Sequence, residues 1–288
     1  MGSLLAAELL KMRKRWLPYG LLLFMIGGTA IIIWLGGYAD WQGSEDAEFK
    51  QSALRAFAMP YSIPALLDSG QFWGSVFVAV LVASVVATEY NWGTVRQALI
   101  RGQSRTQYVL VKLAALVLFS ALSLLVALGV GIGFSVLATS LADLPITLDV
   151  LDGPSFAEVI LMVLRAGYAV IPYGMLAFCL AVVGRSTAIG AAGVMAYVIA
   201  ESIAIAIFNE SSISVLRDLR DVLPGHHAQA LIGANRIGSG DYNHLSFREL
   251  PVPSELPDPN FAALVLGLWS LALLSIALYV FRRRDLKT

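Results

Sequence analysis

Six long apolar segments alternate with shorter polar ones along this chain. They cover about 17–38, 71–88, 108–141, 156–184, 187–208 and 261–281. Crossing about 30 Å of hydrocarbon takes about 20 residues of helix, and each segment is close to or above that length. The pattern therefore predicts an all-α polytopic membrane protein with six transmembrane helices, folded as a single transmembrane domain over 1–288.

Composition supports this class. Hydrophobic residues make up 58% of the chain and charged residues only 14%, with a mean hydropathy of +0.73. A soluble domain would carry about 25% charged residues. The single cysteine, Cys179, excludes an intrachain disulfide and a cysteine metal site, so we expect it to be a small buried hydrophobic residue. No metal site is expected.

The charges are unevenly distributed, although the formal net charge is zero. Most lysines and arginines lie near the two ends of the chain and in the segment between the second and third apolar runs. Most acidic residues lie in the alternate loops. The positive-inside rule then places both termini in the cytoplasm, which an even number of spans also requires.

The first polar segment, 3–16, has a helical repeat of apolar residues. These residues fall at i, i+4, i+7 and i+11: Leu5, Leu9, Met12 and Trp16. Lysines and arginines lie off this stripe. The pattern predicts an amphipathic helix in the plane of the inner membrane surface, in contact with membrane lipids. The alternative is a simple basic anchor beside the first span.

The segment between the second and third spans predicts a short cytoplasmic helix. Glu89 lies at the membrane exit, Gly93 breaks the helix, and a short amphipathic turn follows over 94–100. Ser104 and Gln107 have the spacing of a capping box that starts the next helix. The side chains offered to a partner are Arg96, Arg101 and Arg105. The alternative is a solvated basic loop.

These residues form Glu-x-x-x-Gly-Thr-x-Arg followed by Arg-Gly-x-Ser-Arg. With LPGHHAQAL at 223–231 and FRRRDLK at 281–287, the chain resembles the type-2 ABC exporter permeases, which are prokaryotic plasma (inner) membrane proteins. The resemblance implies two six-helix subunits, as a homodimer or homologous heterodimer, each docked on a cytoplasmic ATPase subunit. The helix after the second span would be the coupling helix. Its implied contact residues are Glu89, Gly93, Thr94, Arg96, Arg101, Ser104 and Arg105.

The chain is not expected to be an enzyme by itself. None of its lysines lies in a G-x-x-x-x-G-K-[ST] loop, so ATP and Mg²⁺ would bind the partner subunit and this chain would hold no cofactor. No nucleic-acid partner is expected. Two other functions remain open: a secondary transporter or channel, and a membrane anchor or immunity protein that does not transport.

Two ionisable residues, Arg165 and Glu201, fall well inside the fourth and fifth spans. A lone charge there costs at least about 2.5–3.5 kcal/mol. Their similar depth on adjacent helices predicts that they pair, or face one polar cavity, as an interhelical lock or as part of a substrate path. The outer segment 209–260 is expected to pack over the outer mouth through helices at 212–222 and 226–232. We expect its adjacent histidines, 226 and 227, on the surface or in a helix cap.

Overall fold

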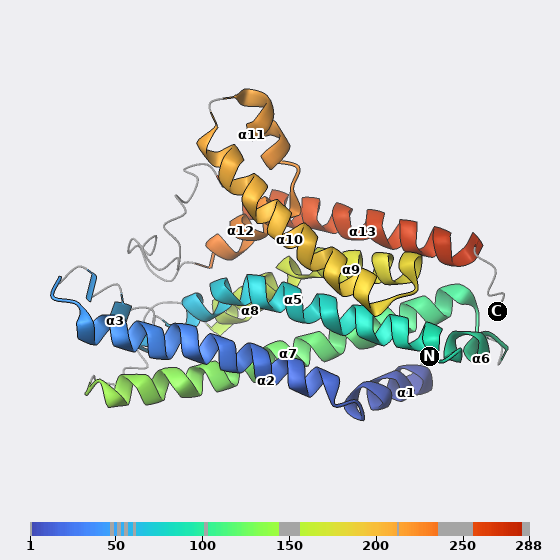
Figure 1. Ribbon diagram of the computed structural model, residues 1–288, viewed down its shortest axis with the longest axis horizontal. Helices are drawn as coiled ribbons and strands as arrows, with labels where there is room; N and C mark the ends of the chain where they lie inside the picture. The colour runs from blue at the N-terminus through green and yellow to red at the C-terminus, as the bar shows by residue number, and fades with distance from the viewer. Residues whose placement is uncertain are drawn as a thin grey trace.

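The computed structural model describes residues 2–46, 49–50, 53–54, 57–59, 62–100, 103–143, 156–211, 213–235 and 256–283. Within these ranges the regular structure is helical, without a strand (Figure 1). The elements are α1 Gly2–Arg13, α2 Leu17–Thr29, η1 Ala30–Gly36, α3 Gly37–Gly43, α5 Ser62–Asn91, α6 Thr94–Ile100, α7 Arg105–Leu141, α8 Phe156–Ala169, α9 Ile171–Gly184, α10 Thr187–Glu210, α11 Ser214–Arg220, α12 Pro224–Gly233 and α13 Pro259–Arg283.

Six helical stretches are long and apolar enough to cross a membrane. They are Leu17–Gly43, Gln71–Asn91, Arg105–Leu141, Val159–Gly184, Thr187–Asn209 and Pro259–Arg283. The prediction of an all-α polytopic membrane protein with six spans is confirmed, and the ends of the spans move by only a few residues. The longest helix, α7, has 37 residues and reaches about 55 Å, which exceeds the hydrocarbon thickness.

Two spans are less regular than the sequence predicted. The first continues from α2 through a π-helical stretch, η1, into α3. The fourth, predicted as one helix over 156–184, is divided into α8 and α9 at Val170. Pro172 in the first turn of α9 explains the break, because proline removes one helical N–H and its ring clashes with the preceding turn.

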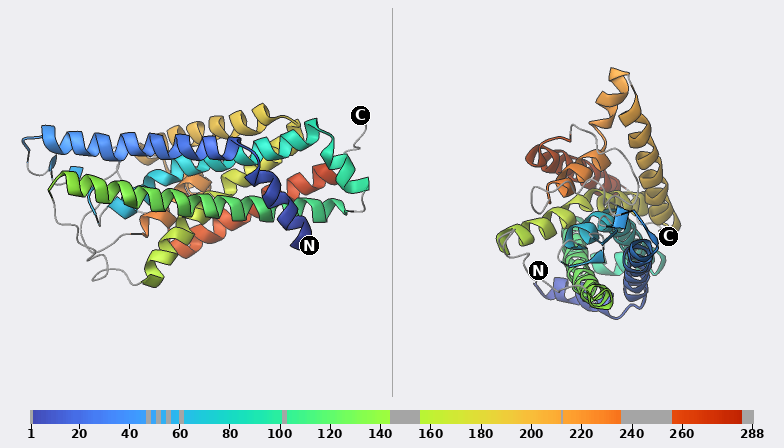
Figure 2. Two further views of the ribbon diagram at one scale, coloured as in Figure 1. Left: turned by 90° about the horizontal axis from the view of Figure 1, so that it is seen from below. Right: turned by 90° about the vertical axis from the view of Figure 1, so that its left-hand side faces the viewer.

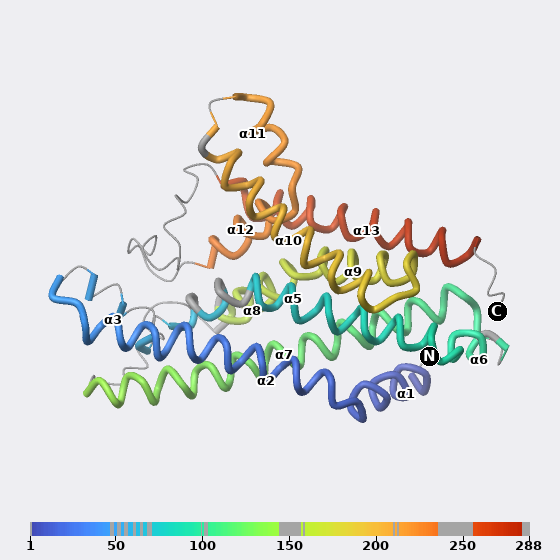
Figure 3. The backbone as a smooth tube through the Cα atoms, viewed as in Figure 1, coloured from blue at the N-terminus to red at the C-terminus, as the bar shows by residue number. Residues whose placement is uncertain are grey.

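The most extensive helix–helix contacts join α5, α9, α10 and α13, and the second and fourth spans are the most buried. A large buried apolar cluster, including Leu81, Ala177 and Val194, joins α5, α9 and α10. Both termini and α6 lie at one end of the molecule, and α3 lies at the other (Figure 1, and the tube in Figure 3). This shared end is what the predicted topology requires of the N-terminus, the C-terminus and the loop between the second and third spans.

The N-terminal helix α1 crosses α7 near that end (Figure 2). Met12 is fully buried, and Leu5 and Leu9 pack beside it on the central apolar cluster. Trp16 lies beyond the end of α1 and is 82% exposed. Three residues of the predicted apolar stripe thus pack on protein and Trp16 does not, and contact of this helix with membrane lipids stays a prediction.

Candidate functional site

The short helix α6 is held between α5 and α7 by specific local geometry. Gly93 has a φ of +66°, a conformation that glycine adopts without strain, and it turns the chain from α5 into α6. Val95 is buried beneath α6, whereas Arg96 and Gln97 are exposed. The Ser104 hydroxyl accepts a hydrogen bond from the backbone N–H of Gln107 at 3.1 Å, as the capping prediction required.

Not every predicted contact residue of this helix is offered to a partner. Arg101 lies outside the described residues. Arg105 donates to the carbonyl oxygens of Phe281 and Arg282 at 2.8 and 2.7 Å, so it caps the end of α13. Thr94 donates to the carbonyl of Glu89 at 3.3 Å. The expectation that Arg105 is free to bind a partner is wrong, because the C-terminal end of α13 lies against the start of α7.

Glu89 is buried and belongs to a cluster of four charged side chains. Its carboxylate lies 2.6 Å from Nζ of Lys112 and 3.5 Å from Nζ of Lys11. Glu8 lies 2.9 Å from Lys112 and 2.5 Å from Lys11. Tyr108 also donates a hydrogen bond to Glu89. This four-charge cluster, Glu8, Lys11, Glu89 and Lys112, ties α1 to the ends of α5 and α7 beside α6.

The pairing within the four-charge cluster is reflected in the two members that lie on α1. Burial alone would raise the pKa of Glu8, but the charges and hydrogen bonds of Lys112 and Lys11 outweigh it and lower that pKa. Burial alone would lower the pKa of Lys11, but Glu8 and Glu89 outweigh it and raise that pKa. Both groups are therefore charged at neutral pH, and the cluster is electrically balanced.

Arg165 and Glu201 do not pair with each other, and that prediction is wrong. The ion pairs among the described residues do not include them. Instead, Glu201 accepts the backbone N–H of Gly225 at 2.8 Å, in the first turn of α12. Arg165 donates to the carbonyl oxygen of Ala234 at 3.0 Å, just beyond the last residue of α12. The two charges hold the opposite ends of one short helix.

The signs of these charges suit the helix that they hold. Free N–H groups make a helix N-terminus favourable for an anion, and free carbonyl groups make the C-terminus favourable for a cation. Glu201 also accepts hydrogen bonds from the hydroxyls of Tyr173 at 2.8 Å and Tyr197 at 3.2 Å. Its two oxygens thus have three donors from α9, α10 and α12, which supports the interpretation of Glu201 as an interhelical lock.

The helix α12 lies among membrane spans rather than on the surface. It contacts α13, α8, α10 and α5. His226 and His227 are 1% and 0% exposed, so the expectation of surface or cap histidines is wrong. Nε2 of His226 lies 3.4 Å from the carboxylate of Asp221. Nε2 of His227 lies 2.7 Å from the backbone carbonyl oxygen of the same residue. Burial, followed by the nearby Arg220 charge, lowers the pKa of His226 to about 4.

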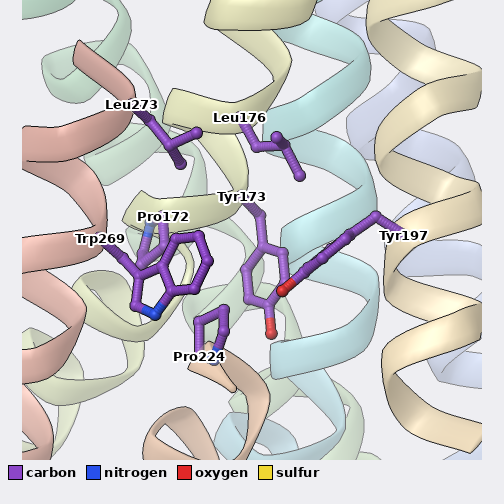
Figure 4. A pocket seen from close by; sticks show the side chains of 7 residues that line it. All are labelled: Pro172, Tyr173, Leu176, Tyr197, Pro224, Trp269 and Leu273. Carbon is purple, nitrogen blue, oxygen red and sulfur yellow. The ribbon is translucent and has the colours of Figure 1, made fainter. Parts of the chain in front are cut away.

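Figure 4 shows a small hollow beside Tyr173 and Tyr197, the two tyrosines that donate to Glu201. Side chains from α9, α10, α12 and α13 surround it, including Tyr173, Tyr197, Pro224 and Trp269. The indole N–H of Trp269 donates to the carbonyl of Val222 at 3.0 Å, away from the hollow. Its volume is only about 30 Å³, and a cavity needs about 10–15 Å³ to hold one water molecule. It is a packing gap, too small for a transported compound.

A much larger cavity is lined by other residues of α9, including Ile171, Gly174 and Met175. Its walls come from α2, η1, α5, α7, α8 and α9, and its volume is about 720 Å³. That is within the usual range of about 300–1,000 Å³ for small-molecule sites. Neither Arg165 nor Glu201 lines it. We name it the apolar cavity, because its walls are almost entirely hydrocarbon.

Comparison with known proteins places the chain in a family without an assigned role. A family model described as "Protein of unknown function (DUF2705)" matches residues 67–220, more than half of the chain. The protein therefore belongs to this family. The match runs from α5 through α11, so it includes α6, Glu89, Lys112 and Glu201 but not α1 or α12. No curated protein matches the sequence.

The sequence signal for these sites was uneven. Intramembrane charges are conspicuous in an apolar segment, so Arg165 and Glu201 were found, although their partners were not. Glu8 and Lys112 were not assigned to a site. Their partnership joins residues 104 positions apart and has no local pattern, apart from the i, i+3 spacing of Glu8 and Lys11.

Proposed function

We propose that this protein is the permease subunit of an ATP-driven exporter of the type-2 ABC class, located in a prokaryotic plasma membrane with both termini in the cytoplasm. The observation that carries the proposal is the arrangement around α6. This helix is joined to two spans by a glycine turn and a capped restart, and its Arg96 and Gln97 side chains are exposed. This geometry suits α6 to act as a rigid contact through which an ATPase moves α5 and α7.

The neighbouring elements support the same use of this end. The four-charge cluster attaches α1 to α5 and α7, and Arg105 attaches α7 to the end of α13. A force applied at α6 therefore reaches four elements through buried or capped contacts. In this proposal α1 is the second contact with the ATPase, ATP and Mg²⁺ bind that subunit alone, and two permease subunits alternate between inward- and outward-open states.

Crosslinking at α6 tests the proposal. A cysteine at Gln97 is expected to crosslink to an ATPase subunit that co-purifies with the full-length chain, and Arg96→Glu is expected to weaken that co-purification. A cysteine at Leu137, an exposed residue near the far end of α7, is the matched control and is expected to give no crosslink.

Three results would contradict the proposal. Labelling of the Gln97 cysteine by a membrane-impermeant reagent from outside intact cells would refute the topology. Flux driven by a proton or sodium gradient without ATP would identify a secondary transporter or channel. Absence of both an ATPase partner and any flux would favour a membrane anchor.

A further inference from the structure

We propose that the apolar cavity between α2, η1, α5, α7, α8 and α9 is a binding site for the acyl chains of a membrane phospholipid. The lipid is a resident component held within one subunit. This inference does not depend on the transport function proposed above. It rests on the chemistry of the cavity walls, on the dimensions of the cavity and on the irregular helix at one side.

The walls offer nothing to a polar or charged ligand. The described residues that line the cavity include no Asp, Glu, Lys, Arg or His. Several of its polar side chains already donate elsewhere: Thr29 to the carbonyl of Met25, Ser123 to that of Phe119, and Tyr168 to that of Ala263. A buried water needs two to four polar partners, so water does not satisfy this space. Hydrocarbon is the ligand chemistry that does.

The cavity is elongated along α7. Its wall there extends from Leu113 to Gly131, which is about 27 Å at the rise of an α-helix. This is close to the whole hydrocarbon thickness of about 30 Å, so the acyl chains of one phospholipid, which span one leaflet side by side, occupy about half of its length. The lining residues belong to the membrane spans, where phospholipid is the surrounding solvent.

Flexible hydrocarbon chains are thinner than a helix, which is about 10 Å across with its side chains, so they follow the irregular wall of the cavity.

The π-helical stretch η1 gives the wall a fixed irregularity at one side of the cavity. Trp34, in η1, lines the cavity, and its indole N–H donates to the Ser135 hydroxyl at 2.8 Å. Its ring also stacks on Phe134, with centroids 5.2 Å apart. Short π-helical stretches inside α-helices are frequent at functional sites. Trp34 thus places a rigid aromatic side chain in the wall of the cavity, and its contacts with α7 hold it there.

Photocrosslinking tests the site directly. The full-length chain is reconstituted in vesicles of phosphatidylethanolamine and phosphatidylglycerol that contain a trace of phospholipid with a diazirine near the end of one acyl chain. After illumination and detergent extraction, adducts are mapped by peptide mass spectrometry. We expect them to concentrate on cavity-lining residues of α7 and α8, above the level on outward residues of α7 such as Leu118 and Leu122.

Matched substitutions on α7 separate the cavity from ordinary lipid contact. Ala127 lines the cavity, whereas Ala114 is an exposed residue of the same helix that does not. Ala127→Trp is expected to abolish the cavity adducts, and Ala114→Trp is expected to leave them unchanged. Ala121→Trp, also in the wall, serves as the second test if Ala127→Trp elutes as aggregate.

Three outcomes would overturn the proposal. Adducts spread evenly over inward and outward faces show bulk lipid only. Cavity adducts that persist in both lining variants place the lipid elsewhere. Loss of the cavity adducts during ATP-driven turnover identifies transported substrate rather than a resident lipid.

Discussion

Removing Lys112 is expected to destabilise the protein far more than removing Lys11, although both contact the same two carboxylates. Lys112 is 1% exposed and lies 2.9 and 2.6 Å from Glu8 and Glu89, whereas the Lys11 side chain is 51% exposed. Lys112→Met leaves Glu8 and Glu89 with Lys11 alone, and water cannot replace the lost ammonium at this buried position. Breaking a buried pair in this way costs about 3–5 kcal/mol. Lys11→Met removes a half-solvated pair, which is worth about 0.2–1 kcal/mol.

The measurement is the free energy of unfolding of the detergent-purified chain, by titration with SDS from mixed micelles. Glu89→Gln combined with Lys112→Met is expected to recover part of the loss, because it removes the carboxylate left without its partner. Equal effects of Lys11→Met and Lys112→Met would refute the reasoning, since burial is the only large difference between them. So would a double variant whose loss equals the sum of the two single losses.

Three other predictions concern α12 and the residues that contact it. Gly225→Ala is expected to cost about 1–3 kcal/mol in the same assay, because its Cβ would lie 2.8 Å from Cδ of Glu201; Gly233→Ala, at the far end of α12, is the milder control. Losses from Arg165→Met and Glu201→Gln are expected to add to within about 0.5 kcal/mol, since the two bind different residues at opposite ends of α12, and a coupling above about 1 kcal/mol would show that they act on α12 together. The lowered pKa of His226 stabilises the fold fully above pH 6.5, and this contribution is lost as the pH falls toward 4; His226→Gln should flatten the pH dependence of unfolding in that window.

The four-charge cluster has its own pH limits. A lowered pKa of Glu8 gives a contribution that is complete above its ordinary value of 4.5 and is lost below it. A raised pKa of Lys11 gives one that is complete below 10.5 and is lost above it. The attachment of α1 is therefore expected to be unaffected between these values, so acid sensitivity between pH 6.5 and 4.5 reports on His226 rather than on the cluster.

The spans could be predicted from the sequence because their main determinant is one-dimensional. Apolar run length fixes a transmembrane helix with little help from tertiary contacts. The same holds for the turn at Gly93 and the cap at Ser104, which depend on neighbours within four residues. These local features placed α6 correctly between the second and third spans.

The partners of the buried charges could not be predicted in the same way. Arg165 and Glu201 lie at similar depth in their spans. Pairing was therefore the expected arrangement, on the assumption that no other element lay between the two helices. The structure inserts α12 there, and its backbone ends supply partners that no side-chain pattern reveals. The burial of His226 has the same cause. Lys112 is buried for a similar reason, because Glu8 approaches it from α1.

The break at Val170 means that the fourth span is not one mechanical unit. Its α9 half packs with α5, α10 and α13 in the centre, while its α8 half is fastened to the end of α12 through Arg165 and through Asn235, which donates to the carbonyl of Met162 at 3.3 Å. The two sets of contacts meet at Val170, where the helix is broken. A shift of the end of α12 is therefore expected to move α8, which lines the apolar cavity, more than α9.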